Sequence, residues 1–561
     1  MSDVEAIKTG SDLLRGDIAE ELSSGTASFG ERSQTLLKFH GTYQQDDRDL
    51  RKERRETGSE KAYQFMVRSR IPGGVLSAQQ YLVHDELATR YGNGTLRLTT
   101  RQGIQLHGVL KGELRATIRA IDAALLTTLA ACGDVNRNVM ACPAPPATPL
   151  QASVAAAAHE LAAHLTPRTR AYHELWLDGE KQSEPEAEPI YGPSYLPRKF
   201  KIALALPDDN CVDAFTQDLG FVAEERDGTL AGYTVLAGGG MGSTHGKHET
   251  YPRLATPLAS IAPRELLEVA EAVVTVQRDY GDRANRKHAR LKYLVQERGI
   301  DWLRGEVEHR IGRRLADPNP VRFQGARDHL GWHAQADGNR YLGLHVASGR
   351  IADRVTALVR RGIRAVLERH RAGVHLTPQQ NLLLTGISPR DVGAVDALLR
   401  SYGVETDPAK LGIRRAALAC PALPTCGLAV AEAERALPAV VDLLERELAR
   451  LGLGGEEIAV RMTGCPNGCA RPRTSEIGIV GRSLGIYDVF VGGDAAGRRL
   501  NEVLARGVPQ NELIGVLRPL LQRWKVERLP GEAFGDFAAR AKIESWRPAP
   551  LDERDAALVR S

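Results

Sequence analysis

The chain contains an internal repeat, which limits the possible folds more than any single motif does. Three pairs of stretches match, the first two pairs at one offset of 278 positions: Leu96–Val109 with Val374–Ile387, Arg137–Ala144 with Arg415–Ala422, and Tyr233–Gly239 with Tyr487–Gly493. A tandem duplication of this length predicts two similar α/β halves that pack face to face. The natural place for a ligand is then between the two halves.

Local patterns predict helices and strands within each copy. A helix is expected from Leu82 to Arg90, followed by strands at Leu96–Thr99 and Ile104–Gly108. Residues 1–55 are polar and helix-prone, with leucines and isoleucine at helical spacing from Leu13 to Leu22. We expect this segment, and the charged run that follows it, to form an arm with a solvated face.

Composition excludes several classes of protein. At 561 residues the chain is too long for one core and should form several domains. The net charge is +4, from 74 basic and 70 acidic side chains, which argues against a body built to neutralise nucleic-acid phosphates. The first residues do not resemble a secretory signal, and no apolar run is long enough to span a bilayer. A reducing cytoplasm is therefore expected to surround the seven cysteines.

Four of those cysteines form two close pairs. Cys420 and Cys426 have five residues between them, and Cys465 and Cys469 have three. Thiolates gathered in this way bind a metal centre more often than they fill a core. The spacing favours an iron–sulfur cluster over zinc, and a site without metal is the third alternative. A helix is expected directly after Cys426, with its N-terminus toward the anionic cluster.

The remaining cysteines and the first copy show a different pattern. Cys132, Cys142 and Cys211 lack a close partner in sequence and are interpreted as buried free thiols. Cys142 matches Cys420 in the repeat, but Thr148 occupies the position of Cys426. The first copy instead keeps cations, which suggests a strongly anionic ligand: Arg68, Arg97, Arg101, Arg137, Arg198, Lys199 and Lys201. Strand alternation would place Arg97, Thr99 and Arg101 on one face, and Gln105 and His107 likewise.

Two further stretches each have two interpretations. Residues 238–248 are rich in glycine and nearly match a phosphate loop, but His248 replaces the expected Ser or Thr. A tight connection after a strand is favoured there. The basic stretch from Arg283 to Lys292 could bind nucleic acid, yet it lacks interleaved aromatic residues. A solvated or cofactor-facing helix is favoured for it.

The two cysteine segments, Ala419–Cys426 and Gly464–Pro472, resemble the cluster-binding segment of the assimilatory sulfite and nitrite reductase family. The resemblance runs from Leu14 to about Arg547. It implies an α+β (mixed α/β) fold made by tandem duplication of a ferredoxin-like half domain plus a sirohaem/cluster domain, with pseudo-two-fold symmetry. The implied domains are an N-terminal arm (1–60), the first half domain (61–128) and sirohaem domain (129–325), and the second half domain (326–403) and 4Fe–4S/sirohaem domain with its C-terminal tail (404–561).

The resemblance also implies cofactors and residue roles. Cys420, Cys426, Cys465 and Cys469 would hold one 4Fe–4S cluster, and Cys469 would also be the axial ligand of a sirohaem iron. The residues expected to line the sirohaem are Arg97, Thr99, Arg101, Gln105, His107, Arg198, Gln380 and Asn467. Those expected around the bound substrate, and to supply protons, are Arg68, Arg137, Lys199 and Lys201.

The activity implied by the resemblance is the six-electron reduction of sulfite to hydrogen sulfide for cysteine biosynthesis. Nitrite reduction to ammonia on the same scaffold is the alternative, and a non-catalytic protein with a four-cysteine zinc site is a remote one. No strict Gly-x-Gly-x-x-Gly follows a strand, so electrons should come from a second protein. The N-terminal segments resemble a subunit that pairs with an NADPH-dependent flavoprotein, and a ferredoxin is the other candidate. No nucleic acid or membrane partner is expected.

Overall fold

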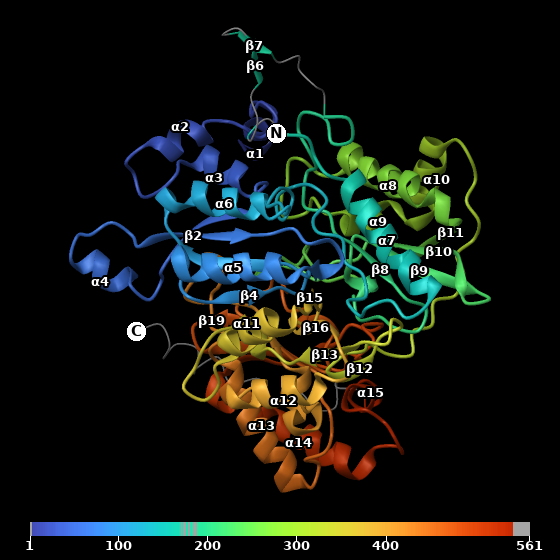
Figure 1. Ribbon diagram of the computed structural model, residues 1–561. Coiled ribbons are helices and arrows are strands. Elements are labelled where there is room, and N and C mark those ends of the chain that lie inside the picture. Colours follow the sequence, from blue (N-terminus) through green and yellow to red (C-terminus); the bar gives the residue numbers. More distant parts are fainter. Residues whose placement is uncertain (1–2, 170, 172–174, 178–179, 183–187, 542–561) are drawn as a thin grey trace. The chain divides into compact units, whose positions relative to one another are not determined.

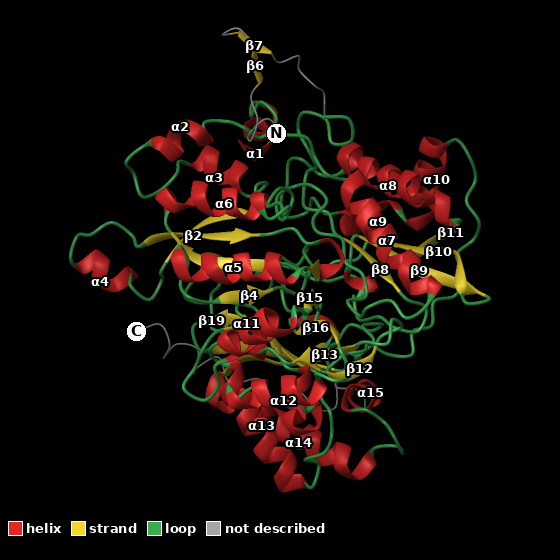
Figure 2. Cartoon of the chain, viewed as in Figure 1, coloured by secondary structure: helices red, strands yellow, loops and turns green. Residues whose placement is uncertain are grey.

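The computed structural model describes residues 3–169, 171, 175–177, 180–182 and 188–541. The C-terminal tail beyond Ala541, to which the predicted last domain and the family resemblance both extend, lies outside the described residues. Two compact units can be distinguished. Unit 1 comprises residues 1–240 and 253–408, and unit 2 comprises residues 241–252 and 409–561. The chain contains both helices and strands throughout its described part, as Figure 2 shows.

Unit 1 contains two five-stranded sheets of matching design. Their strand orders are β1-β2-β5-β4-β14 and β12-β13-β16-β15-β3. The strands of the first are β1 (Thr42–Asp46), β2 (Tyr63–Arg68), β5 (Ile104–Val109), β4 (Leu96–Leu98) and β14 (Arg350–Ile351). Those of the second are β12 (Gly331–Ala334), β13 (Arg340–Leu344), β16 (Leu382–Ile387), β15 (Gly373–Leu376) and β3 (Val75–Leu76). Each sheet thus takes one edge strand from the other copy of the repeat.

The helices of these two half domains follow the same repeat. They are α5 (Ala78–Arg90) and α6 (Leu114–Ala123) in the first copy, and α11 (Val359–His370) and α12 (Val392–Ser401) in the second. Helix α5 begins with a capping box in which Ser77 and Gln80 satisfy each other's backbone N–H groups. Apolar side chains from both copies, such as Leu106 and Leu384, form one continuous core. The predicted duplication of a ferredoxin-like half domain is therefore confirmed.

A third sheet in unit 1 has the strand order β11-β10-β9-β8. Its strands are β8 (Ile202–Ala205), β9 (Leu219–Arg226), β10 (Thr229–Ala237) and β11 (Thr256–Ile261). Four helices gather beside it (Figure 1): α7 (Pro149–His164), α8 (Leu266–Tyr280), α9 (Leu291–Arg298) and α10 (Ile300–Ile311). A separate hairpin pairs β6 (Leu175–Leu177) with β7 (Glu180–Gln182).

Unit 2 repeats this third sheet and extends it by one strand. The order is β17-β18-β19-β20-β21, and the first two pairings are parallel. The strands are β17 (Leu418–Ala419), β18 (Val460–Thr463), β19 (Ile477–Ser483), β20 (Ile486–Val491) and β21 (Glu502–Pro509), and the helices are α13 (Leu437–Leu451), α14 (Leu513–Glu527) and α15 (Phe534–Arg540). In unit 1, Met140 makes a parallel bridge to Ala203 just as Leu418 pairs with Arg461 in unit 2. Met140 and Leu418 are related by the offset of 278.

The N-terminal segment forms several short elements. They are α1 (Asp3–Thr9), α2 (Ile18–Ser23), α3 (Glu31–Leu37) and α4 (Arg51–Glu56). The helical spacing expected from Leu13 to Leu22 is only partly right. Ile18 and Leu22 lie in α2, but Leu13 and Leu14 have φ values of 51° and 68° and are not helical. Strand β1, which lies within the predicted arm, pairs with β2 in the first sheet. The exact domain boundaries stay a prediction.

No helix in the described part of the chain has both the length and the apolar character that crossing a membrane requires.

Candidate cluster and cofactor sites

The sheet of unit 2 places the two cysteine pairs. Cys420 directly follows β17, and Cys465 lies two residues after β18. These strands are parallel neighbours, and the Cys420 backbone N–H donates to the Met462 carbonyl at 3.2 Å. Since the carboxyl ends of parallel strands meet at one edge of a sheet, both pairs arrive at the same edge.

The four thiols lie close enough to influence one another. Burial raises the pKa of Cys420 well above its usual value, and Cys469, Cys465 and Cys426 raise it further. Burial also raises the pKa of Cys465 to about 12, with Cys469 adding to the effect. Four thiolates could not coexist here without a compensating positive charge, which a metal centre would supply. All four thiols are free of disulfides, and Cys469 alone of the four is exposed.

Nearby N–H groups point at the sulfur atoms. The Gly464 backbone N–H donates to Cys420 Sγ at 3.4 Å, and the Asn467 Nδ2 donates to Cys465 Sγ at 3.4 Å. Hydrogen bonds of this kind stabilise the charge on cluster thiolates and tune their potential. The residues present therefore fit a 4Fe–4S cluster.

A single zinc ion would require closely spaced sulfur atoms. Four sulfurs around one tetrahedral zinc would lie about 3.8 Å apart, given zinc–sulfur bonds of about 2.3 Å. Among the described residues, the one group of three or more metal-ligand side chains whose ligand atoms all lie within 4.8 Å of one another is elsewhere in the chain. Cys420, Cys426, Cys465 and Cys469 do not form such a group.

The helix expected directly after Cys426 is wrong. Residues 427–436 form turns, and α13 begins only at Leu437. The backbone N–H groups of Val430 and Ala431 instead donate to the Gly464 carbonyl at 2.8 and 3.0 Å. The local sequence could not predict this loop, because the loop is held by Gly464, a residue of the second cysteine segment.

The glycine-rich stretch at 238–248 is a tight connection after a strand, which was the favoured interpretation. It also makes hydrogen bonds to the cysteine loop. No helix occurs between residues 238 and 255, so the helix that a phosphate loop requires is missing from this described stretch. The Ser243 backbone N–H donates to the Pro466 carbonyl at 2.9 Å, and His245 Nε2 lies 2.8 Å from the Gly481 carbonyl oxygen. Gly468 has a φ of 66°, and a Cβ there would approach Met241 O to 3.1 Å.

Unit 1 gathers the predicted cations. Burial lowers the pKa of Lys201 well below its usual value, and the neighbouring charges of Arg101, Lys199, Arg290 and Arg137 lower it further. Positive charges held this close together create a site for an anion. Arg290, which belongs to the basic stretch from Arg283 to Lys292, is itself neutralised by Asp218 through bonds of 3.1 and 2.6 Å.

A second group of side chains surrounds Arg68. Its Nη1 donates to Cys132 Sγ at 2.5 Å, and its guanidinium lies 6.0 Å from the ring centre of Tyr43. Burial raises the pKa of Tyr43 to about 12, Cys132 adds to this, and Arg137 and Arg68 oppose it. Tyr43 lies on β1, in a segment that we had interpreted as an arm. No local pattern marked it.

The predicted alternation along the first strand is only partly right. Strand β4 ends at Leu98, so Thr99 and Arg101 lie in the turn that leads to β5. Arg97 on β4 pairs with Gln105 on β5, and Gln105 and His107 share a face of that strand. These two polar side chains are buried.

His107 is the clearest sign of a missing anionic partner. Both of its ring nitrogens are buried without a hydrogen-bond partner. Burial lowers its pKa well below the usual value, and Arg350, Arg97 and Arg68 lower it further. A neutral imidazole among three guanidinium groups fits a carboxylate-rich cofactor such as sirohaem. Arg350 comes from the second copy, on β14 opposite Arg97, and only knowledge of the strand exchange could have revealed it.

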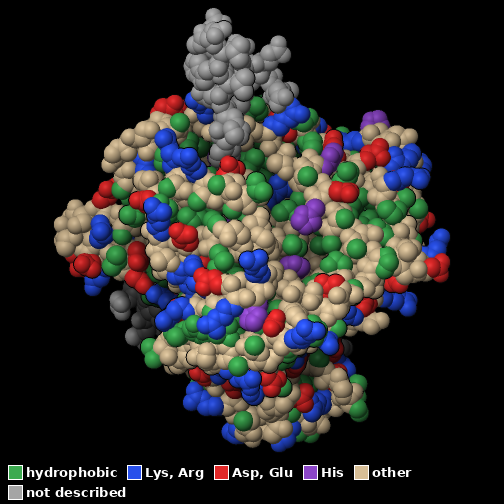
Figure 3. Space-filling view, in the orientation of Figure 1, with side chains coloured by type: hydrophobic (Ala, Val, Ile, Leu, Met, Phe, Trp, Pro, Cys, Tyr) green, Lys and Arg blue, Asp and Glu red, His purple; other side chains and the backbone are tan. Residues whose placement is uncertain are grey.

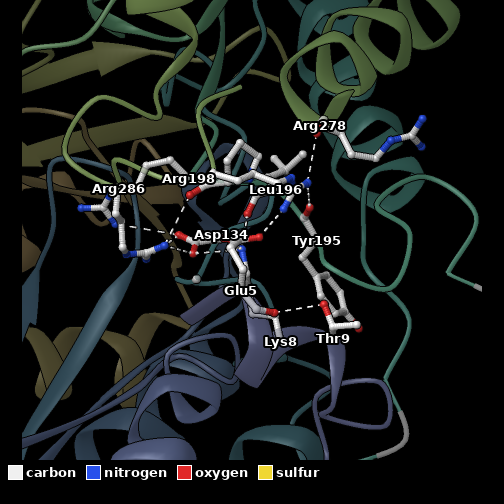
Figure 4. A network of polar contacts seen from close by, with 12 residues as sticks. Glu5, Lys8, Thr9, Asp134, Tyr195, Leu196, Arg198, Arg278 and Arg286 are labelled. Atoms are coloured by element: carbon white, nitrogen blue, oxygen red, sulfur yellow. Dashed lines mark hydrogen bonds and ion pairs between the residues drawn. The ribbon is translucent and has the colours of Figure 1, made fainter. Parts of the chain in front are cut away.

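Arg198 takes part in a charge network near the N-terminus (Figure 4). Its Nη1 lies 3.8 Å from Asp134 Oδ1, while Arg286 binds the same carboxylate with bonds of 2.6 and 3.0 Å. Lys8 on α1 contacts Asp134 at 3.8 Å and donates to the Leu196 carbonyl at 2.7 Å. The network therefore attaches α1 to the rest of unit 1. A cofactor contact by Arg198 stays a prediction.

The basic stretch that contains Arg286 is not a helix for most of its length. Helix α9 begins only at Leu291, and Arg283, Arg286 and Arg290 precede it. They form ion pairs with Glu5, Asp134 and Asp218 respectively. Basic and acidic side chains are interspersed over the molecular face in Figure 3, as expected for a nearly neutral chain.

Gln380 lies in the turn between β15 and β16, with a φ of 65°. Its counterpart in the repeat, Gln102, has a φ of 50° and donates to the carbonyls of Gly73, Ala141 and Leu376. The shared conformation reflects the duplication. The cofactor contact assigned to Gln380 stays a prediction.

Comparison with known proteins supports this arrangement. A model described as the nitrite/sulfite reductase ferredoxin-like half domain matches residues 58–124 and 333–402. A second model, described as the nitrite and sulphite reductase 4Fe-4S domain, matches residues 157–315. The sulfite reductase (NADPH) hemoprotein beta-component of Myxococcus xanthus is 49% identical over 542 residues, which cover 96% of each chain. The chain belongs to the nitrite and sulfite reductase family.

Two further similarities extend over nearly the whole chain. The protein of the same name from Geobacillus kaustophilus is 48% identical and covers 97% of this chain and 96% of its own. The solved structure of the NirA protein of Mycobacterium tuberculosis has a TM-score of 0.76 and 25% identity, and it covers 95% of both chains. The 4Fe-4S domain match falls on the first copy, whose matched residues contain only Cys211. The four-cysteine set belongs to the second copy of the same fold.

Proposed function

We propose that this chain is the haemoprotein component of an assimilatory sulfite reductase, which reduces sulfite to hydrogen sulfide. The observation that carries the proposal is the coincidence of full-length similarity to proteins named sulfite reductase with a four-thiol site at one sheet edge. When bound, a 4Fe–4S cluster and sirohaem would supply electrons one at a time to the substrate sulfur. Cys420, Cys426, Cys465 and Cys469 would hold the cluster, and Cys469 would also ligate the sirohaem iron.

The cations of unit 1 would bind the substrate dianion and donate protons to it. Arg101, Arg137 and Lys199 supply positive charge around Lys201 before substrate arrives, so little reorganisation is needed. An anion bound beside Lys201 would raise the pKa of its amine again, so the amine takes up a proton as sulfite enters. That proton can then be given to a sulfite oxygen. With a second proton from solvent and two electrons that the bound cofactors would supply, the S–O bond would break and the oxygen would leave as water.

His107, Arg97 and Arg350 would orient the cofactor and leave its reacting face to the other cations. Guanidinium groups match carboxylates with two parallel hydrogen bonds. The buried imidazole nitrogens of His107 would gain the partners that they lack. Arg68, held by Cys132, would lie between these two groups of side chains.

The electron donor is proposed to be an NADPH-dependent flavoprotein, because the relatives are named as components of an NADPH-type enzyme. A reducing cytoplasm would suit the seven cysteines, none of which forms a disulfide in the described part of the chain.

Sulfide formation by the purified holoenzyme tests the proposal directly. Sulfite with NADPH and the flavoprotein should yield sulfide, whereas NADPH with this chain alone should yield none. Parallel reactions with reduced ferredoxin and with nitrite identify the preferred donor and substrate. Sulfide production only from ferredoxin would contradict the proposed donor, and ammonia formation from nitrite without any sulfide from sulfite would contradict the proposed substrate.

A further inference from the structure

Four side chains of metal-binding type meet in unit 1. Cys142, Asp209, Cys211 and His329 place one ligand atom each within 4.8 Å of all the others. Three of these residues are buried and Cys142 is half-buried. Cys142 and Cys211 are free thiols, as predicted, but residues distant in sequence bring them together in one cluster.

The distances within this group fit a tetrahedral ion. Cys142 Sγ lies 3.6 Å from His329 Nε2, which lies 3.6 Å from Asp209 Oδ2. Zinc bonds of about 2.0–2.3 Å to oxygen, nitrogen and sulfur place neighbouring ligand atoms about 3.3–3.8 Å apart. A central ion could thus be accommodated with small adjustments.

Asp209 is oriented as a ligand would be. Its Oδ1 accepts the backbone N–H groups of Cys211 at 3.0 Å and Arg327 at 2.9 Å. Its Oδ2 is buried without a hydrogen-bond partner and lies 3.6 Å from His329 Nε2, the distance of an ion pair rather than of a hydrogen bond. A buried carboxylate oxygen without a hydrogen bond is costly, and a metal ion would supply the missing contact.

The surrounding backbone fixes the other ligands. Asn210 donates its backbone N–H to the Gly325 carbonyl at 2.9 Å, and Gln379 Nε2 donates to the Cys211 carbonyl at 2.7 Å. His329 is held at a φ of 57°, a conformation that is uncommon outside glycine. Contacts that orient metal ligands in this way are typical of built metal sites.

We propose that Cys142, Asp209, Cys211 and His329 form a closed structural zinc site. Two thiolates, one imidazole and one carboxylate suit zinc, and four protein ligands leave no open position for substrate. Cys142 is the repeat counterpart of Cys420, so each copy of the fold uses the same position for a metal ligand. The ion ties the loop after β8 to the connection that leads into β12.

A metal-free cluster is the competing state. In it, the neighbouring Cys211 and His329 lower the pKa of Cys142 despite burial. Burial lowers the pKa of His329, but Asp209 and Cys142 outweigh it and raise that pKa to about 10. A thiolate–imidazolium pair or an oxidised Cys142–Cys211 disulfide would then take the place of zinc.

Elemental analysis of the purified holoenzyme distinguishes these states. Protein produced with zinc in the medium should contain about one zinc per chain in addition to its iron. X-ray absorption at the zinc edge should show two sulfur and two nitrogen or oxygen neighbours. Asp209→Asn and Cys211→Ala should each lower the zinc content at least about tenfold while the iron content is retained.

Asp208→Asn is the matched control, because Asp208 is the adjacent carboxylate and forms an exposed ion pair with Arg327. Its zinc content should equal that of the wild type. Wild-type holoenzyme without zinc, or with a Cys142–Cys211 disulfide found by mass spectrometry, would overturn the proposal. So would zinc that remains bound in both ligand variants, or a zinc spectrum without sulfur neighbours. The wild-type measurements decide the matter even if a variant fails to fold.

Discussion

At the scale of single residues, burial rather than partner charges determines several protonation states. Burial lowers the pKa of His40 to about 4, although its Nε2 hydrogen-bonds the Leu14 carbonyl at 2.9 Å. His84 and His375 are lowered by burial as well. These imidazoles stay neutral in the folded protein, so acid favours the unfolded chain, in which histidine can accept a proton.

The resulting pH dependence can be measured at His40. Since its folded pKa lies below the unfolded value of about 6.5, the unfolded chain takes up a proton first as pH falls. The free energy of unfolding should therefore decrease from about pH 6.5 down to about pH 4, by about 3 kcal/mol from this residue. In His40→Gln, denaturant titrations should show a shallower loss over this range. The exposed His309→Gln should leave the slope unchanged, and an unchanged slope in His40→Gln would contradict the assignment.

Cys469 and the unit 1 cations should fail in different ways when replaced. Cys469→Ser should lose both the sirohaem absorption and sulfide production, because one sulfur would serve two metal centres. Arg137→Ala and Lys201→Ala should keep the absorption and lose sulfide production at least about 100-fold, since they would act on substrate and protons. Absorption spectra and turnover of the same preparations separate the two outcomes.

Lys287→Ala serves as the control for the loss of one positive charge, because Lys287 is exposed. It should keep both absorption and turnover. Near wild-type sulfide production by Arg137→Ala or Lys201→Ala would exclude the role assigned to that residue.

At the scale of elements, the cysteine loop depends on close backbone packing. A Cβ at Gly464 would meet the Ala431 carbonyl oxygen and would lie 2.6 Å from Ala422 Cβ. Gly464→Ala should therefore displace the loop and lower the iron content per chain severalfold. Gly427→Ala is the matched control in the neighbouring segment, because a Cβ there has no atom within 4 Å. Equal iron content in the two variants would show that this packing is not needed for the cluster.

Sequence patterns predicted these elements unevenly. The expected helix through Leu82–Arg90 lies within α5, and both strands of the following hairpin were found. Periodicity reports which residues are buried, and in these elements burial coincides with secondary structure. The turn containing Thr99 and Arg101 and the loop after Cys426 were missed because contacts with distant residues hold them.

Part of the candidate site could be predicted from the sequence. The four cysteines and most of the cations lie in short motifs that can be recognised in a single sequence. Three other residues were missed because only the tertiary structure brings them to the site. Tyr43 lies on β1, Cys132 is a buried thiol that contacts Arg68, and Arg350 lies on the exchanged strand β14.

At the scale of the whole molecule, the half domains cannot be separated from each other. Their apolar side chains share one core, and Arg364 on α11 donates to Asp85 on α5 at 2.6 Å. A fragment of residues 326–561 would expose that core and lack β3, which pairs with β15. It should be insoluble when expressed alone and become soluble when residues 1–325 are expressed with it. Cooperative thermal unfolding of the isolated fragment would contradict this expectation.

The assignment of residues 241–252 to unit 2 has a consequence during synthesis. Ser243 and its partner Pro466 are 223 residues apart, and His245 and Gly481 are 236 apart. At about 5–20 residues per second, a ribosome needs roughly 10–50 s to make that intervening chain. For this time the segment is outside the ribosome without its partners. The segment is polar and contains glycine: Met-Gly-Ser-Thr-His-Gly-Lys-His-Glu-Thr-Tyr-Pro. While it lacks its partners, it therefore exposes no apolar surface on which other nascent chains would aggregate.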